Sequence, residues 1–256
     1  MRLVSEDFDY KNCNLDLSER YIRDNLGLDI ENWAKFRHGI YVGTDSKVLK
    51  PRKNVTKDVK ETYLELGKSH YEVITTLGYL KISMLAIEDQ ISAKQSFLVF
   101  KLCKEFYFHS GCLLDNLARL IYIIVDNKSV TKKDSRGCFV RHWFDWGKLK
   151  EKKYPGYIKF CRSKKIKEII NVRNQMAHSW RCIIGENYSW PEAIRNNRDL
   201  KWPYDNEGWR RYKKWLCIKD MIKFDFEYLE KFQNNVFKRL FQDISRFEKN
   251  NKIFIG

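Results

Sequence analysis

The chain has 256 residues, enough for one sizeable core, so it is not a disulfide-stapled miniature, and we expect one main domain carrying insertions. Its 49 Lys and Arg outweigh 33 Asp and Glu, a net charge of +16 that favours polyanions such as nucleic acid. A solvated lysine-rich surface would produce the same charge, so composition indicates a class of partner and names no reaction.

The seven cysteines are scattered and include no C-x-x-C pair, which argues against a disulfide framework or a zinc ribbon and fits a reducing cytoplasm. Acidic residues follow Met1 too soon for a signal peptide. The strongest apolar run, Leu113 to Val125, is interrupted by charged and polar residues. We therefore expect a cytoplasmic protein with no membrane span.

Residues 1–55 are expected to form peripheral helices that precede the main domain, residues 56–256. Apolar positions are loosely spaced between Asp16 and Phe36, and Asn25 and Gly27 are expected to split this stretch into two short helices.

Helical spacing then predicts two long helices that pack antiparallel. The first covers Thr56 to Ile91 and can kink near Gly78, and the second covers Ser92 to Val125 and can break near Gly111. The apolar face expected on the second helix comprises Phe97, Phe100, Phe106, Leu113, Leu117, Leu120 and Ile124.

Two stretches rich in aromatic and basic residues, about 126–163 and 180–216, have the composition of insertions. They flank a third helix, Lys164 to Ser179. The final helix is expected over Met221 to Lys249, with Phe224 on its apolar face. The predicted fold is therefore all-α, a bundle of four main helices with extra N-terminal helices and two insertions around the third core helix.

The third helix ends with Arg173-Asn174-Gln175-Met176-Ala177-His178. Arginine is always charged and offers forked donors to phosphate, and histidine, with an unperturbed pKa of about 6.5, exchanges protons near neutrality. Asn174 and His178 share a helix face, whereas Arg173 lies about 140° from His178 around the axis. The arginine must therefore wrap around the helix, or the last turn must open, for the two to act together.

The pattern Arg173-Asn174-x-x-x-His178, at the end of a helix in a four-helix setting, resembles the R-x(4-6)-H signature of the HEPN superfamily. The long preceding helix with Leu114-Asp115-Asn116-Leu117-Ala118 and the long C-terminal helix are also similar to HEPN proteins. The resemblance covers roughly Thr56 to Asn250, without the insertions. An Arg and a His that only complement a helix C-terminus would give the same short pattern.

The resemblance implies a metal-independent endoribonuclease with no cofactor, built as a homodimer whose two motifs face each other. His178 of one protomer would act as base, its symmetry mate as acid, Arg173 would bind the scissile phosphate, and Asn174 would orient the imidazole or a nonbridging oxygen. The attacking group would be the ribose 2′-OH, so RNA and not DNA would be cut. The products would carry 2′,3′-cyclic phosphate and 5′-hydroxyl ends.

Other residues are weaker candidates. Asp115 is our candidate for a supporting carboxylate behind the motif. The aromatic and basic runs have the interleaving that stacks bases and binds phosphates, although they could equally anchor the insertions. The RNA-binding candidates are Arg141, Trp143, Lys164, Lys165, Trp209, Arg210 and Arg211. Cys138, His142 and Cys161 lack a fourth ligand, so no metal site is predicted.

By analogy with HEPN proteins, we expect a toxin or antiviral defence effector, with an antitoxin or an activating partner. Two alternatives stay open at this point. The chain could be a HEPN module that binds nucleotides or RNA without cutting, in which Arg173 and His178 only hold a phosphate. It could also be an interaction protein in which the motif occurs by chance.

Overall fold

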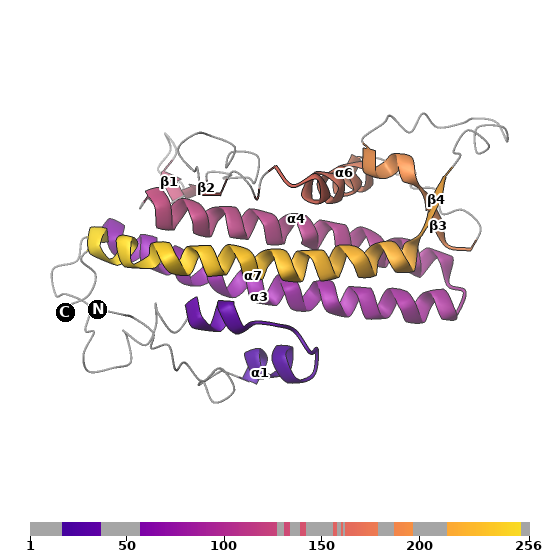
Figure 1. Cartoon of the computed structure of the whole chain (residues 1–256), viewed down its shortest axis with the longest axis horizontal. Coiled ribbons are helices and arrows are strands. Elements are labelled where there is room, and N and C mark those ends of the chain that lie inside the picture. Colours follow the sequence, from indigo (N-terminus) through magenta and orange to yellow (C-terminus); the bar gives the residue numbers. More distant parts are fainter. Residues whose placement is uncertain are drawn as a thin grey trace. The chain divides into compact units, whose positions relative to one another are not determined.

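The computed structural model describes residues 17–36, 57–126, 131–133, 139–141, 156–157, 160, 162–178, 187–196 and 214–251. Of these residues 84% are helical, which confirms the expectation of a mostly helical protein. The helices are α1 (Leu17–Asp24), α3 (Lys57–Ser92), α4 (Ser96–Asp126), α6 (Lys164–His178), the 3-10 helix η2 (Glu192–Asn196) and α7 (Ile218–Asn251), shown in Figure 1. A further helical segment covers residues 31–36.

The chain forms two compact units, each assembled from segments distant in sequence. Unit 1 comprises Met1–Thr75, Leu114–Ile158 and Glu230–Gly256, and unit 2 comprises Thr76–Leu113 and Lys159–Leu229. Each unit therefore contains a portion of α3, α4 and α7, whereas α6, η2 and the strands β3 (Ser189–Pro191) and β4 (Trp215–Cys217) belong to unit 2 alone.

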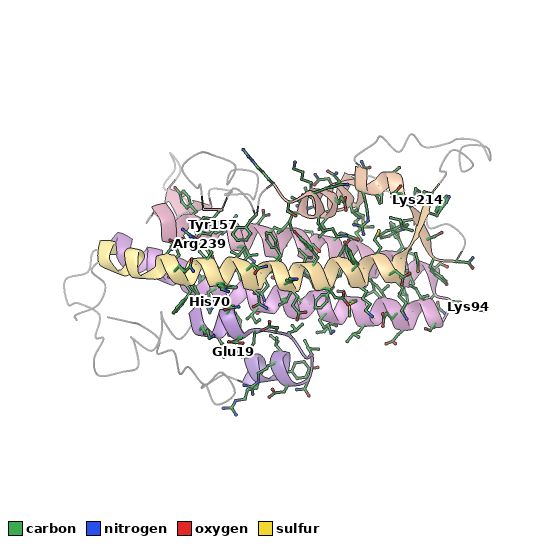
Figure 2. The ribbon with its side chains drawn as sticks, in the orientation of Figure 1. Glu19, His70, Lys94, Tyr157, Lys214 and Arg239 are labelled. Carbon is green, nitrogen blue, oxygen red and sulfur yellow. The ribbon has the colours of Figure 1, made fainter. Side chains whose placement is uncertain are left out.

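A tight turn joins α3 to α4 in unit 2. The Gln95 N–H donates to the Gln90 carbonyl at 2.9 Å and the Lys94 N–H donates to the Ile91 carbonyl at 3.1 Å. Lys94, labelled in Figure 2, takes the left-handed conformation with φ 57°, so these two bonds form a Schellman motif that ends α3. Further along, the rings of Tyr79 and His109 lie 5.2 Å apart, so α3 and α4 are antiparallel in this unit, as predicted.

An aromatic cluster forms part of the core of unit 1. Trp33 stacks on His70 of α3, with 4.5 Å between ring centroids and 7° between ring planes, and the Trp33 indole N–H donates to the His70 carbonyl at 3.0 Å. Phe36 and Phe237 of α7 complete the cluster around His70, which Figure 2 labels. The expectation that the N-terminal helices are peripheral is therefore wrong for residues 31–36, because Trp33 and Phe36 are fully buried.

A second anchor in unit 1 holds residues 156–157 against α7. The Tyr157 hydroxyl donates to the Asp243 carboxylate at 2.7 Å, and the Arg239 guanidinium lies 6.0 Å from the Tyr157 ring centroid. Figure 2 shows Tyr157 and Arg239 near one another. Burial, followed by the hydrogen bond to Asp243, raises the pKa of Tyr157 well above its ordinary value.

The two stretches expected as insertions contain short strands that were not predicted. In unit 1, β1 (Thr131–Lys133) pairs antiparallel with β2 (Phe139–Arg141). In unit 2, β3 pairs antiparallel with β4, with Trp190 opposite Leu216. Strands of three residues are too short to show a period-two hydrophobic pattern, and for β3 and β4 the partners lie more than twenty residues apart.

The predicted long helices exist, but some details differ. Helix α3 is unbroken through Gly78 and α4 is unbroken through Gly111, so the expected break near Gly111 is wrong. Phe97 and Phe224, both expected on apolar faces, are 78% and 58% exposed. No helix in the part of the chain that the structure describes is long and apolar enough to cross a membrane.

Candidate functional site

Helix α6, which carries the Arg-to-His cluster, begins at a defined N-cap. Ser163 caps it, because its hydroxyl accepts from the Ile166 N–H at 3.4 Å and its carbonyl accepts from the Lys167 N–H at 3.2 Å. The helix buries an apolar face and remains helical through His178, so its last turn does not open. The buried side chains are Ile166, Ile169, Val172 and Met176.

Arg173 packs across α4 at Gly111, and Figure 1 shows α6 beside α4. A Cβ built on Gly111 would lie 3.1 Å from Arg173 Nε and 3.6 Å from its Cγ. Any larger residue at position 111 would push the arginine aside. The glycine expected to break α4 instead provides the space in which Arg173 lies.

The Arg173 guanidinium turns toward the neighbouring residue on α6. Its Nη1 donates to Asn174 Oδ1 at 3.1 Å, although positions 173 and 174 point about 100° apart around a helix. Positions 174 and 178, four residues apart, share one face of α6. The arginine therefore wraps around the helix toward the face that carries Asn174 and His178, the first of the two arrangements that the spacing allowed.

The charge of Arg173 is not neutralised by any residue that the structure describes, since no carboxylate there forms an ion pair with it. Its Nε is buried and has no hydrogen-bond partner. Its Nη2 forms no hydrogen bond with a described residue. A half-buried guanidinium without a counter-charge among the described residues, held by packing on one side and by an amide on the other, is suited to binding an anion through its Nη atoms.

A buried ionic cluster ties α6 to the rest of unit 2. Asp225 of α7 is fully buried and accepts two hydrogen bonds from Arg195 of η2, at 3.1 and 3.0 Å. Lys165 of α6 places its ammonium 2.6 Å from the same carboxylate. The Tyr107 hydroxyl of α4 donates to Asp225 at 2.7 Å. One carboxylate thus joins four elements: α4, α6, η2 and α7.

Two further contacts connect α6 to η2. The Asn171 side chain donates to the Arg195 carbonyl at 2.8 Å, and Glu168 lies 3.7 Å from the Arg195 guanidinium. Asn171 is only two residues before Arg173. These contacts therefore fix the rotation of α6 about its axis close to the cluster.

The pKa values in the ionic cluster follow from burial and from the Asp225 charge. Burial raises the pKa of Tyr107 well above its ordinary value, and the Asp225 charge raises it further. Burial opposes the charged form of Arg195, but Asp225, with Tyr107 and Glu168, raises its pKa above the ordinary value. The tyrosine is therefore a neutral donor and the arginine a permanent cation, so the cluster is structural over the ordinary pH range.

The structure brings together some of the predicted residues. Arg173 and Asn174 are in contact in unit 2, whereas Asp115 is half-buried on the part of α4 that belongs to unit 1. Lys164 is 90% exposed, but Lys165 is 15% exposed and paired with Asp225, so its charge is already used inside the unit.

Several predicted residues fall where the structure gives no side chain. The backbone of His178 ends α6, and that of Arg141 ends β2, but their side chains are not described. The other RNA-binding candidates and the rejected zinc ligands lie outside the described residues: Trp143, Trp209, Arg210, Arg211, Cys138, His142 and Cys161. Within the described ranges, no group of three His, Cys, Asp or Glu residues could hold a metal ion.

The sequence pattern does not point to Gly111, Asp225 or Arg195 as parts of this region. A glycine inside a strongly helical stretch was a usable signal, because it often marks a close approach of another group. Comparison of the chain with protein-family models, with curated proteins and with solved structures finds no match.

Proposed function

We propose that the chain is a metal-independent endoribonuclease of HEPN type, acting through Arg173, Asn174 and His178 as a homodimer. The observation that supports it best is the state of Arg173. Its guanidinium is bonded to Asn174, forms no ion pair with a described residue and has no described partner at Nη2, at the end of the helix that His178 terminates. A phosphate is the anion that such a forked, partly desolvated donor set fits.

The proposed reaction is attack of a ribose 2′-OH on the adjacent phosphate. His178 removes the 2′-OH proton, the new bond to phosphorus closes a cyclic phosphate, and the 5′-oxygen leaves with a proton from His178 of the partner subunit. Arg173 stabilises the negative charge that develops on the nonbridging oxygens. Asn174 keeps the guanidinium on the His178 face of α6. By the HEPN resemblance we further propose a toxin or antiviral role with a regulating partner.

The test is incubation of the purified chain with structured and unstructured RNA in EDTA, followed by analysis of the fragment ends. The proposal predicts 2′,3′-cyclic phosphate and 5′-hydroxyl ends from the wild type. His178→Ala and Arg173→Ala should each lower the rate by at least about a hundredfold. Lys238→Gln, an exposed substitution on α7, is the control for loss of a surface cation and should cleave normally.

Other outcomes would contradict parts of the proposal. Cleavage that requires Mg²⁺, or that His178→Ala retains at equal thermal stability, would remove the motif from catalysis. RNA binding that depends on Arg173 without any cleavage would favour the alternative, a HEPN module that holds phosphate without cutting. A protein that stays monomeric at assay concentration while cutting RNA would exclude the paired-motif mechanism.

A further inference from the structure

Four side chains form a line along one face of α4 in unit 2: Phe97, Lys101, Lys104 and Phe108. At about 100° per residue, these positions fall within about 60° of one another around the helix. Phe97 is 78% exposed, Phe108 is 56% exposed, and the side chain of Lys101 is 61% exposed. Lys104 is also exposed. We refer to these four residues as the α4 stripe.

The stripe faces away from the core. On the opposite side of the same helix, Val99, Cys103 and Phe106 are fully buried. A single exposed aromatic side chain is common on a protein surface, so neither ring alone is informative. Two such rings in line with two lysines on one helix face are the combination that suits a binding surface. Between Ser96 and Leu113 the single acidic residue is Glu105, which lies 3.5 Å from Lys101 in an exposed pair of little energetic weight.

The α4 stripe leads to the candidate site. It begins one residue after the start of α4, near the turn that Lys94 marks in Figure 2. It ends at Phe108, three residues before Gly111, on which Arg173 packs. The His109 ring lies 5.7 Å from the Phe108 ring and 5.2 Å from the Tyr79 ring, which extends the aromatic surface at this end.

We propose that the α4 stripe binds single-stranded nucleic acid and guides it toward Arg173. Bases stack on Phe97 and Phe108, and phosphates pair with Lys101 and Lys104. The two rings are separated by eleven residues, about 16 Å along the helix, which is roughly the length of five stacked bases. That the bound strand is an RNA substrate rests on the proposed ribonuclease function, whereas the binding itself does not.

The charge of the stripe favours this occupant over a second copy of the chain. In a two-fold symmetric contact the same patch lies on both sides, so Lys101 and Lys104 would approach their own copies. Like charges brought together in this way oppose association. A single strand of nucleic acid instead supplies planar faces for the rings and regular negative charge for the lysines, in keeping with the net charge of +16.

The rings are tested with a fluorescent twelve-nucleotide oligo-dT, which contains no 2′-OH and cannot be cut by the proposed mechanism. Fluorescence anisotropy should show that Phe97→Leu and Phe108→Leu each weaken binding about tenfold, since leucine keeps the apolar bulk but removes the stacking face. Tyr21→Leu is the matched control, because Tyr21 is 53% exposed on α1 and lies outside the stripe. It should bind as the wild type does.

The lysines are tested through the salt dependence of the same binding. Lys101→Gln/Lys104→Gln should reduce the slope of log affinity against log salt by about 1.4, because each phosphate contact to a single strand contributes about 0.7. Lys231→Gln/Lys238→Gln removes the same charge from exposed positions of α7 and should leave the slope unchanged.

Oligo-dT binding tests the α4 stripe, and RNA cleavage tests the proposed function, so the two proposals can fail separately. Unchanged oligo-dT binding by the ring variants would overturn the stripe, even if RNA is cut in EDTA. Weakened binding by the ring variants would support the stripe, even if no RNA is cut. A wild-type dimer that the ring variants convert to monomers, with binding unaltered, would assign the stripe to contact between copies and overturn the proposal.

Discussion

Arg195 and Asp225 form two parallel hydrogen bonds, Nη1 to Oδ1 at 3.1 Å and Nη2 to Oδ2 at 3.0 Å, and the Asp225 side chain has no exposed surface. The geometry is bidentate, the arrangement in which an arginine and a carboxylate bind most strongly. Because Lys165 of α6 contacts the same carboxylate, the pair determines where the helix carrying Arg173 lies in unit 2.

Substitution of Asp225 should be severely destabilising. Asp225→Asn leaves Lys165 without its counter-charge and leaves the buried Arg195 with only the Glu168 carboxylate 3.7 Å away, so we expect the free energy of unfolding to fall by about 3–5 kcal/mol. Glu168→Gln, which removes a partly exposed carboxylate 3.7 Å from the same arginine, should cost less than about 1 kcal/mol. Urea unfolding of both variants measures the difference, and equal costs would show that Asp225 does not anchor α6.

Alkaline pH should weaken the fold through Tyr107. Its pKa is raised in the folded protein by burial and by Asp225, so the unfolded chain loses this proton from about pH 10 while the folded chain keeps it. The stabilisation is thus complete below about pH 10 and is lost as the pH rises toward the folded pKa. In Tyr107→Phe the unfolding free energy should fall less steeply with pH, by up to about 1.4 kcal/mol for each pH unit.

The measurement for Tyr107 is urea unfolding in steps above about pH 10, with tyrosinate absorbance followed in the folded state. Tyr157→Phe should flatten the decline in the same way, because burial and Asp243 raise the pKa of Tyr157 as well. An unfolding free energy with the same pH dependence in wild type and Tyr107→Phe would contradict the buried, neutral state assigned to this hydroxyl.

Trp33 should be as important for stability as a residue of the long helices. It is fully buried and stacks on His70, so Trp33→Ala should lower the free energy of unfolding by about 3–5 kcal/mol. Tyr21→Ala on α1, where the ring is 53% exposed, should change it by about 0.5 kcal/mol or less. If Trp33→Ala hardly changed the free energy of unfolding, residues 31–36 would be peripheral, as the sequence suggested.

Gly111→Ala should separate stability from activity. Alanine is favoured over glycine inside a helix by up to about 1 kcal/mol, so we expect the melting temperature to be maintained or raised. The new Cβ would stand 3.1 Å from Arg173 Nε, which must shift by a few tenths of an ångström, and RNA cleavage should fall about tenfold. Full cleavage by Gly111→Ala would show that this packing does not position Arg173.

The sequence was informative about the helices because their apolar residues recur with helical spacing over many turns. The expected helix Met221 to Lys249 corresponds to α7, and the expected helix Lys164 to Ser179 corresponds to α6. The rotation of α7 was predicted less well. Phe224 was expected inside and Asp225 was not, yet the structure exposes the phenyl ring and buries the carboxylate.

The reason for that error is that the partners of Asp225 lie far away along the chain. Lys165 and Arg195 come from α6 and η2, and a local hydrophobic pattern contains no information about them. The same limit applies to the candidate site. The Arg173 to His178 pattern is visible in the sequence, but the packing of Arg173 on Gly111, more than sixty residues earlier, appears only in the fold.

The most direct measurement of the central claim uses one RNA oligonucleotide whose cleavage position has been mapped, and a copy with a single 2′-deoxy nucleotide at that position. We predict that the wild-type protein in EDTA cuts the all-RNA strand to a 2′,3′-cyclic phosphate and leaves the deoxy-substituted bond intact, because the attacking 2′-OH is missing. Cleavage of both strands at the same bond and at equal rates would contradict the mechanism assigned to Arg173, Asn174 and His178.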